Sequence, residues 1–231
     1  MIIKINKTLN FKRKSISELN ISNDMKDKIN NCWMNFIKDK TDYWNGDIFV
    51  VADIDLNKSI IKICKTKYSS IVYAKRNKDL IIKPLFTSIL LKTKDDKYII
   101  IKNNHNCINL IGGMADYSDF EDDKFSPDLC IKREVDEEIG IDLNDDNKVI
   151  NYQMKYLKVP TNDENYCTIG ILYTGTLNYN SEEFKEYTSS NKFDCEIKEY
   201  YCYSKEECLN LELKKSDISY LKEFILIESN N

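Results

Sequence analysis

A segment with clear helix start and stop signals, residues 126–140, constrains the fold of this chain more than any other stretch. Ser126 is a preferred N-cap residue, Pro127 suits the first helical position, and Gly140 suits the left-handed residue that ends a helix. The apolar residues between these signals recur every four positions: Ile131, Val135 and Ile139. This spacing predicts one helix whose apolar stripe packs against a core.

The same helix carries a cluster of carboxylates beside that stripe. Glu134, Glu137 and Glu138 are spaced i, i+3 and i+4, so they project from one face. Carboxylates so close together repel one another unless cations neutralise them, and oxygen-only ligands suit Mg²⁺ or Mn²⁺. Arg133 stands four residues before Glu137, where it can hold that carboxylate in position. Taken alone, the pattern also fits a solvated acidic helix face.

The rest of the chain predicts an α/β fold, with a mixed sheet and helices on both faces. Strand patterns fall at 48–52, 60–64, 71–74, 85–91, 98–101, 108–111, roughly 149–158 and 166–176, and 196–203. Helix patterns fall at 25–37, 204–211 and 217–227. Residues 1–20 are expected to form an edge strand or an arm, and the polar stretch 178–193 a surface loop.

Composition excludes several functional classes. The net charge of −4 argues against nucleic-acid binding by bulk charge, which needs a basic surface. The eight cysteines show no paired spacing and are expected to be reduced, and the single His105 excludes two-histidine metal sites. No apolar run approaches the ~20 residues of a membrane span, and the N-terminus lacks the apolar stretch of a signal peptide. We therefore expect a cytoplasmic protein without a membrane partner.

Residues 133–141, Arg-Glu-Val-Asp-Glu-Glu-Ile-Gly-Ile, resemble the core of the Nudix box at every specified position, R-E-U-x-E-E-x-G-U with U aliphatic. Gly112 and Gly113, at the end of a predicted strand, correspond to the glycine turn that opens the box. The resemblance departs from the pattern upstream of Arg133. The further Glu of the box would fall on Phe125, so residues 114–125 are an acidic insertion. Glu121 is a candidate replacement for that Glu, although a solvated loop is the favoured interpretation.

The resemblance implies a function and a set of site residues. Glu134, Glu137 and Glu138 would bind Mg²⁺ or Mn²⁺ together with the Gly113 carbonyl, Gly112 would complete the turn, and Arg133 would orient the carboxylates. The family often adds a later Glu as ligand or general base, for which Glu196 is preferred here over Glu199. The implied fold is a Nudix-type α/β/α sandwich over residues 84–231, with residues 1–83 an N-terminal extension of strands and one helix.

The substrate implied by the resemblance is a nucleoside diphosphate linked to another small moiety. The order of aromatic and basic residues before residue 84 is similar to that of the UDP-glucose diphosphatase branch. UDP-sugars therefore come first and ADP-ribose second, whereas triphosphates and RNA caps rank lower. Dimers are frequent in the family, so a homodimer is compatible with the resemblance. Two alternatives remain open: a Nudix-fold module that binds a nucleotide without cleaving it, and a non-Nudix domain whose acidic helix is an interaction surface.

Overall fold

The computed structural model describes residues 1–5, 8–39, 44–122, 124–160, 167–191, 193, 196–214 and 218–230, with the backbone alone for 12–18. The helices are α1 Asn23–Ile37, α2 Tyr68–Ala74, α3 Pro127–Ile139, α4 Ser181–Ser190, α5 Lys205–Asn210, α6 Leu221–Glu228 and the 3₁₀ turn η1 Tyr117–Asp119. The strands are β1 Ile2–Lys4, β2 Asn10–Glu18, β3 Asp47–Asp55, β4 Ile60–Lys67, β5 Leu85–Lys92, β6 Tyr98–Asn103, β7 Ile108–Asn109, β8 Phe120–Glu121, β9 Lys124–Phe125, β10 Val149–Lys158, β11 Ile169–Leu177 and β12 Ile197–Tyr203.

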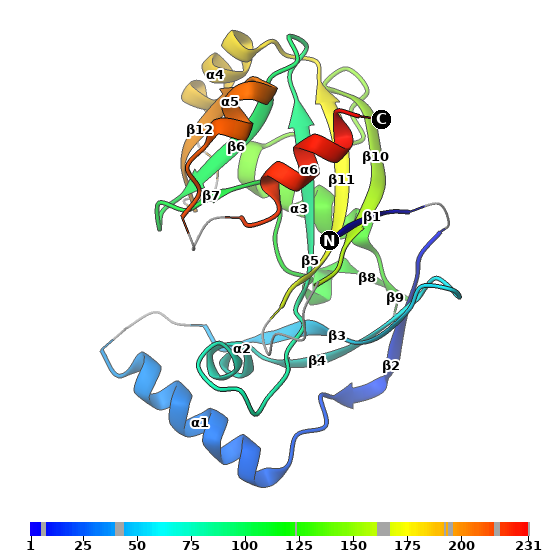
Figure 1. The fold of residues 1–231 in the computed structure, drawn as a ribbon, viewed down its shortest axis with the longest axis vertical. Coiled ribbons are helices and arrows are strands. Elements are labelled where there is room, and N and C mark those ends of the chain that lie inside the picture. The colour runs from blue at the N-terminus through cyan, green and yellow to red at the C-terminus, as the bar shows by residue number, and fades with distance from the viewer. Residues whose placement is uncertain are drawn as a thin grey trace.

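The main sheet has the strand order β1-β10-β11-β5-β6-β12, with β7 paired to β6 (Figure 1). Strands β11 and β5 run parallel and the other pairs are antiparallel, so the sheet is mixed. Only Lys92 and Tyr98 pair between β5 and β6. The two strands therefore separate beyond this point, which leaves an edge of β5 available to another segment.

Helices cover both faces of this sheet, which confirms the predicted mixed α/β fold. On one face, the apolar stripe of α3 and Phe184 of α4 are buried in the largest core cluster. On the other face, Cys208 of α5 and Phe224 of α6 are buried in a second cluster. The stripe is fully buried, as its four-residue apolar spacing predicts. Burial of each Ile or Val side chain contributes roughly 1.5–3 kcal/mol to the stability of the fold.

A second layer, which we call the N-terminal layer, consists of the β2-β4-β3 sheet with α1 and α2 (Figure 1). Alternating residues of β3 face opposite sides, as the two-residue period of a strand requires. Phe49 and Val51 join the core cluster beneath α3, whereas Ile48 and Val50 pack in a third cluster with Ile71 of α2. The layer is therefore attached to the main domain through one apolar face of a small sheet.

Two of the predicted elements are wrong. Residues 71–74 were expected to form a strand but belong to α2, so the N-terminal part contains two helices. Residues 69–74 are all buried, and a short run without periodicity does not distinguish a strand from a buried helix. The expected loop 178–193 contains α4, which begins with a capping box of Asn180 and Glu183 and is anchored by Phe184. None of the described helices is long and apolar enough to cross a membrane.

Candidate active site

Helix α3 has the start and stop that its sequence predicts. The Ser126 hydroxyl accepts a hydrogen bond from the Leu129 N–H at 3.3 Å, and Gly140 ends the helix with φ 62°. Two tyrosines, one from β12 and one from α4, hold the C-terminal end. The Tyr200 hydroxyl donates to the Glu138 carbonyl at 2.7 Å, and the Tyr187 hydroxyl donates to the Gly140 carbonyl at 2.8 Å. The helix is therefore fixed at both ends, and its acidic face has a defined position.

The glycine turn lies along the open edge of β5. The Ile89 N–H donates to the Ile111 carbonyl and the Thr87 N–H to the Gly113 carbonyl, each at 3.0 Å. Gly112 has φ 139°, which L side chains rarely adopt, and a Cβ there would overlap the Thr87 carbonyl oxygen. The turn therefore requires glycine at position 112, for its conformation and for its close approach to β5.

Turn and helix meet at the carboxylates. The Gly112 N–H donates to Oε2 of Glu138 at 3.0 Å. A Cβ on Gly113 would overlap the carboxylate of Glu134, so that carboxylate lies directly over the Gly113 backbone. The structure thus brings together Gly112, Gly113, Glu134 and Glu138, which the sequence predicted to be part of one site.

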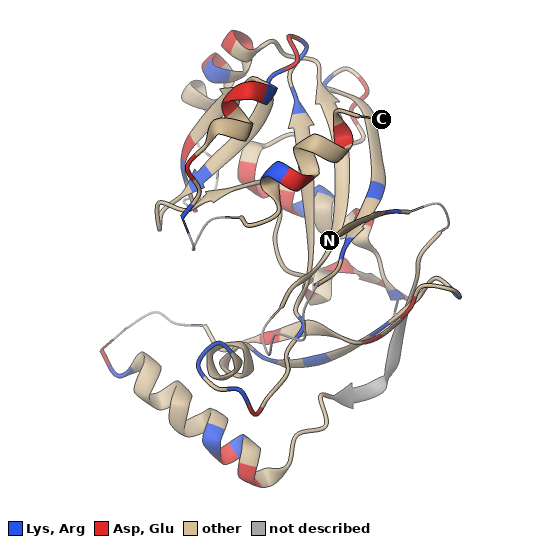
Figure 2. Ribbon diagram, in the orientation of Figure 1, with Lys and Arg blue, Asp and Glu red and all other residues tan. Residues whose placement is uncertain are grey.

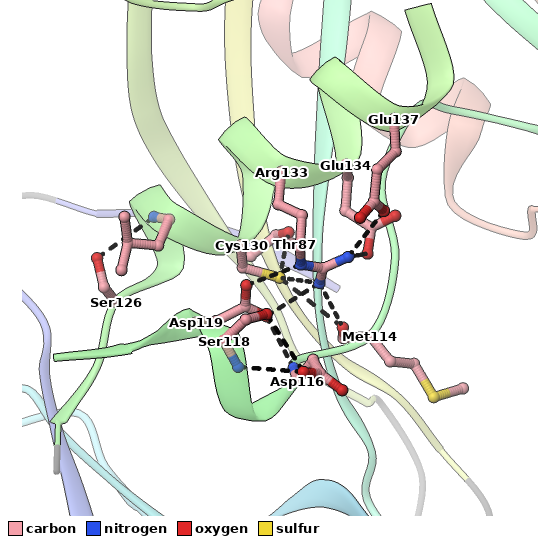
Figure 3. Close-up of polar contacts among 11 residues, drawn as sticks. Thr87, Met114, Asp116, Ser118, Asp119, Ser126, Cys130, Arg133, Glu134 and Glu137 are labelled. Carbon is pink, nitrogen blue, oxygen red and sulfur yellow. Dashed lines mark hydrogen bonds and ion pairs between the residues drawn. The ribbon is translucent and has the colours of Figure 1, made fainter. Parts of the chain in front are cut away.

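Arg133 connects this site to the insertion (Figure 3). Its Nη1 lies 2.8 Å from Oε1 of Glu134 and 3.0 Å from Oε2 of Glu137. Its Nε and Nη2 donate to the two carboxylate oxygens of Asp119, each at 3.0 Å, which is the bidentate geometry of a strong arginine–carboxylate pair. Asp119 is only 1% exposed. Sequence reasoning predicted the contact with Glu137 and missed Asp119.

The insertion 114–125 is folded, and it joins α3 to the N-terminal layer. Asp119 and Asp116 form a capping box around η1, and the β8–β9 hairpin follows. Tyr117 donates from its hydroxyl to Asp47 of β3 at 3.0 Å, and its ring packs edge-on against Phe49. Glu121 is exposed on β8, as the solvated-loop interpretation predicts, whereas the backbone around it is ordered by these contacts. Asp123 lies outside the described residues.

Both carboxylates nearest the glycine turn hold protons more tightly than usual. Burial raises the pKa of Glu134 to about 7, against the opposing effect of Arg133, and the charge of Glu137 raises it further. Burial raises the pKa of Glu138 to about 8, with the Gly112 hydrogen bond opposing it and the charges of Glu134, Glu196 and Glu137 adding to it. Burial is thus the main cause of both shifts and the neighbouring carboxylates add to it, so a bound cation would favour the ionised form of both groups.

The two later glutamates lie in different surroundings. Glu196 is exposed in the turn before β12, and its charge contributes to the raised pKa of Glu138. Glu199 pairs with Lys102 at 3.2 Å and accepts a hydrogen bond from the Tyr201 hydroxyl. Because Tyr200 points toward α3, its neighbour Glu199 faces the opposite side of the sheet. Glu199 therefore lies on the face of the sheet away from α3, and Glu196 stays a prediction as the partner of α3.

The donor set fits a hard divalent cation. It consists of carboxylates that repel one another and a backbone carbonyl at Gly113, all of them oxygen ligands. Figure 2 shows the acidic residues of α3 in red. Within the described residues, no three acidic side chains lie close enough together to hold a metal ion as they stand. Arg133 instead contacts both Glu134 and Glu137. Metal binding would therefore exchange part of that ion-pair network for the cation.

Comparisons with known proteins show a likeness of fold to one solved structure. No family model and no curated protein matches the sequence. Among solved structures, DR0079 from Deinococcus radiodurans is similar at 10% identity and a TM-score of 0.50, over 79% of this chain and 98% of that chain. The MutT protein from Methanosarcina mazei has 18% identity and a TM-score of 0.44, over 67% and 97%. The Nudix domain of Shewanella oneidensis NrtR, complexed with ADP ribose, has 16% and 0.43, over 68% and 92%. At 10% identity, the likeness to DR0079 concerns the fold alone.

Proposed function

We propose that this chain is a Nudix hydrolase that uses Mg²⁺ or Mn²⁺ to cleave the diphosphate of a nucleoside diphosphate linked to another small moiety. The observation that carries the proposal is the junction of the glycine turn with α3. There the Gly112 N–H donates to Glu138, and Glu134 lies over Gly113. The glycines and glutamates of the Nudix-like motif therefore meet in space. A solvated acidic helix face would leave these carboxylates in water, whereas here both are half-buried against a backbone turn.

The residues that would hold the metal are Glu134, Glu137, Glu138 and the Gly113 carbonyl. When bound, the cation would neutralise the charge of the diphosphate and lower the pKa of a water for attack on phosphorus. Gly112 holds Glu138 in place through its N–H, and Tyr200 holds the backbone of the same residue. Arg133 keeps Glu134 and Glu137 on the glycine side of the helix. Glu196 is the proposed ligand or general base from outside α3.

The proposed substrate class is nucleotide sugars, UDP-sugars first, with ADP-ribose-like dinucleotides second. The support is the similarity of the N-terminal residues to the UDP-glucose diphosphatase branch, together with the position of the N-terminal layer. The insertion connects that layer to Arg133, so a group bound beside the layer would lie close to the carboxylates. The layer would therefore contact the part of the substrate that does not react, and so determine which substrate binds.

A substrate panel tests the proposal. UDP-sugars, ADP-ribose, dinucleoside polyphosphates and nucleoside triphosphates would be incubated with Mg²⁺ or Mn²⁺, and the products separated by ion-exchange chromatography. Glu137→Gln is expected to reduce turnover by roughly 100-fold or more, since it removes a carboxylate proposed to hold the cation that stabilises charge at the reacting centre. Asp136→Asn is the matched control, because Asp136 is an exposed acid on the same helix outside the cluster.

Two outcomes would contradict the proposal in different ways. If no compound in the panel is hydrolysed but Mg²⁺ still raises the thermal midpoint, the chain is a binding module with a metal site. If Mg²⁺ and Mn²⁺ leave the thermal midpoint unchanged as well, the acidic face of α3 is not a metal site and the catalytic assignment is wrong.

A further inference from the structure

A cavity of about 270 Å³ lies within the N-terminal layer, where α1 packs beside α2 (Figure 1). Its lining comes from α1, from the C-terminal end of β4 and from the first turn of α2. We call it the α1 cavity. The residues proposed to hold the metal do not line it, and neither does the insertion. The α1 cavity is therefore a candidate site separate from the carboxylates of α3.

Positive charge is in excess in the lining of the α1 cavity. Among the described residues, its cations are Lys26, Lys65 and Lys67, and its one carboxylate is Asp47. The Asp47 carboxylate lies 2.6 Å from Nζ of Lys67 and 3.3 Å from Nζ of Lys65, so two lysines share it. Lys26 forms no ion pair with any described residue. The lining therefore carries a surplus of two positive charges.

Buried hydroxyl groups line the same cavity. Thr66, Ser69 and Ser70 are 7%, 3% and 3% exposed. The hydroxyls of Thr66 and Ser70 lie 2.8 Å apart, so one donates to the other and the second keeps its proton for a further acceptor. The Ser69 hydroxyl has no hydrogen-bond partner among the described residues, although every fully enclosed side-chain oxygen there has one. This hydroxyl must therefore open into the cavity that Ser69 lines.

We propose that the α1 cavity binds a phosphate group, as inorganic phosphate or as a small phosphate monoester. The inference goes beyond the proposed hydrolase activity and does not depend on it. A phosphate monoester carries about −1.5 to −2 charges at neutral pH and three strong acceptor oxygens. The charge matches the surplus of two positive charges in the lining, and the oxygens would accept from the lysines and from the buried hydroxyls.

The arrangement of the donors favours a phosphate over a carboxylate. Lys26 lies on α1, Lys67 on β4 and Ser69 on α2, so the donors come from three different elements. A carboxylate has two oxygens on one edge, whereas a phosphate directs its oxygens to several sides. The cavity is smaller than the ~300–1,000 Å³ of sites for drug-sized ligands, so its ligand is small. Ile29, at 4% exposure, adds apolar surface for the carbon part of a monoester.

Isothermal titration calorimetry tests this site without requiring catalysis. In EDTA, and at an ionic strength held constant with chloride, the whole chain is expected to bind inorganic phosphate saturably, whereas acetate gives no saturable heat. Glycerol 3-phosphate is the monoester probe. Tighter binding of this probe than of inorganic phosphate assigns the site to monoesters, and the reverse order assigns it to the free ion. No saturable binding of either phosphate, or binding of acetate as tight as that of phosphate, would overturn the proposal.

Two variants locate the bound phosphate. Ser69→Ala is expected to raise Kd about tenfold or more, because it removes a hydrogen bond to a charged acceptor. Lys26→Met is expected to raise Kd about three- to fivefold, because it removes one exposed charge from the lining. Lys28→Met is the matched control and should leave Kd unchanged. Lys28 is an exposed lysine of the same helix, but it pairs with Asp24 at 2.9 Å and does not line the cavity.

An unchanged Kd in both Ser69→Ala and Lys26→Met would show that phosphate binds elsewhere in the molecule, and would overturn the assignment. Lys26→Met changes an exposed side chain, so it keeps the test valid if circular dichroism shows that Ser69→Ala does not fold. The failures of the two proposals are distinguishable, because calorimetry in EDTA involves no turnover. Phosphate binding that depends on Ser69 in a chain without hydrolase activity would refute the hydrolase alone, and hydrolysis without such binding would refute the phosphate site alone.

Discussion

Asp119→Asn is the perturbation that tests most directly how the insertion supports the site. The substitution keeps the size of a side chain that is 1% exposed and removes the negative charge facing the guanidinium of Arg133. Its amide oxygen can still accept the hydrogen bonds from the Asp116 N–H, which measures 2.7 Å, and from Nη2 of Arg133, whereas its NH2 group then faces the Nε donor of Arg133. The main change is therefore the loss of one charge and of one of the two hydrogen bonds in a bidentate ion pair.

The expected magnitude follows from the burial of the two partners. Removing one member of a fully buried ion pair costs about 3–5 kcal/mol. Here the Arg133 side chain is 25% exposed and keeps Glu134 at 2.8 Å, so part of its charge remains compensated. We expect a loss of about 2 kcal/mol in the free energy of unfolding, a large part of the ~5–15 kcal/mol of an ordinary domain.

Urea unfolding followed by circular dichroism measures this loss, and a metal titration measures its effect on the site. With Asp119 neutral, Arg133 is expected to pair more closely with Glu134 and Glu137 and to compete with Mg²⁺, so half-maximal activity should need more Mg²⁺. Glu121→Gln is the control, because Glu121 is an exposed acid in the same insertion. An unfolding midpoint for Asp119→Asn equal to that of Glu121→Gln would refute the reasoning.

Three further predictions concern the surroundings of α3. Tyr200→Phe removes the hydrogen bond to the Glu138 carbonyl and should lower the free energy of unfolding by about 1 kcal/mol in urea titrations, and an unchanged midpoint would contradict this role. Glu196→Gln should lower kcat while Glu199→Gln leaves it unchanged, and the reverse order in steady-state assays would overturn the choice between them. The pKa values of Glu134 and Glu138 are raised from 4.5 to about 7 and about 8, so the folded metal-free protein binds their protons more tightly than the unfolded chain does. The stability that this provides is fully present below the unfolded-state pKa near 4.5 and is lost as the pH rises through about 7 to 8. Mg²⁺ should therefore raise the thermal midpoint more at pH 8 than at pH 5, and an equal shift in differential scanning fluorimetry would contradict this linkage.

The site was largely predictable where residues close in sequence carry it. The caps of α3, its buried stripe and its acidic face all follow from local spacing, and the structure places them as predicted. The glycine turn was predicted from the resemblance to the Nudix box, and the close approach of Gly112 to Thr87 explains why a residue without a side chain stands there. Local rules were sufficient for α3 because helix caps and helix periodicity act over a few residues.

The contacts that the sequence did not reveal are long-range. Asp119 is one of several acids in the insertion, and no spacing rule distinguishes the one that reaches Arg133 fourteen residues later. The same limit applies to α2, in which residues 69–74 are all buried, and to α4, where Phe184 is the buried residue of a polar helix. In each case tertiary packing decided what local pattern left open.

Phosphorus NMR of UDP-glucose and of ADP-ribose with the enzyme tests the central claim most directly. With Mg²⁺, the account predicts that the diphosphate signals of at least one compound are replaced by two monophosphate signals. The conversion should stop on addition of EDTA, be lost in Glu138→Gln and persist in Asp136→Asn. Diphosphate signals that stay unchanged with Mg²⁺ and with Mn²⁺ in a folded protein, or cleavage that continues in EDTA or in Glu138→Gln, would contradict it.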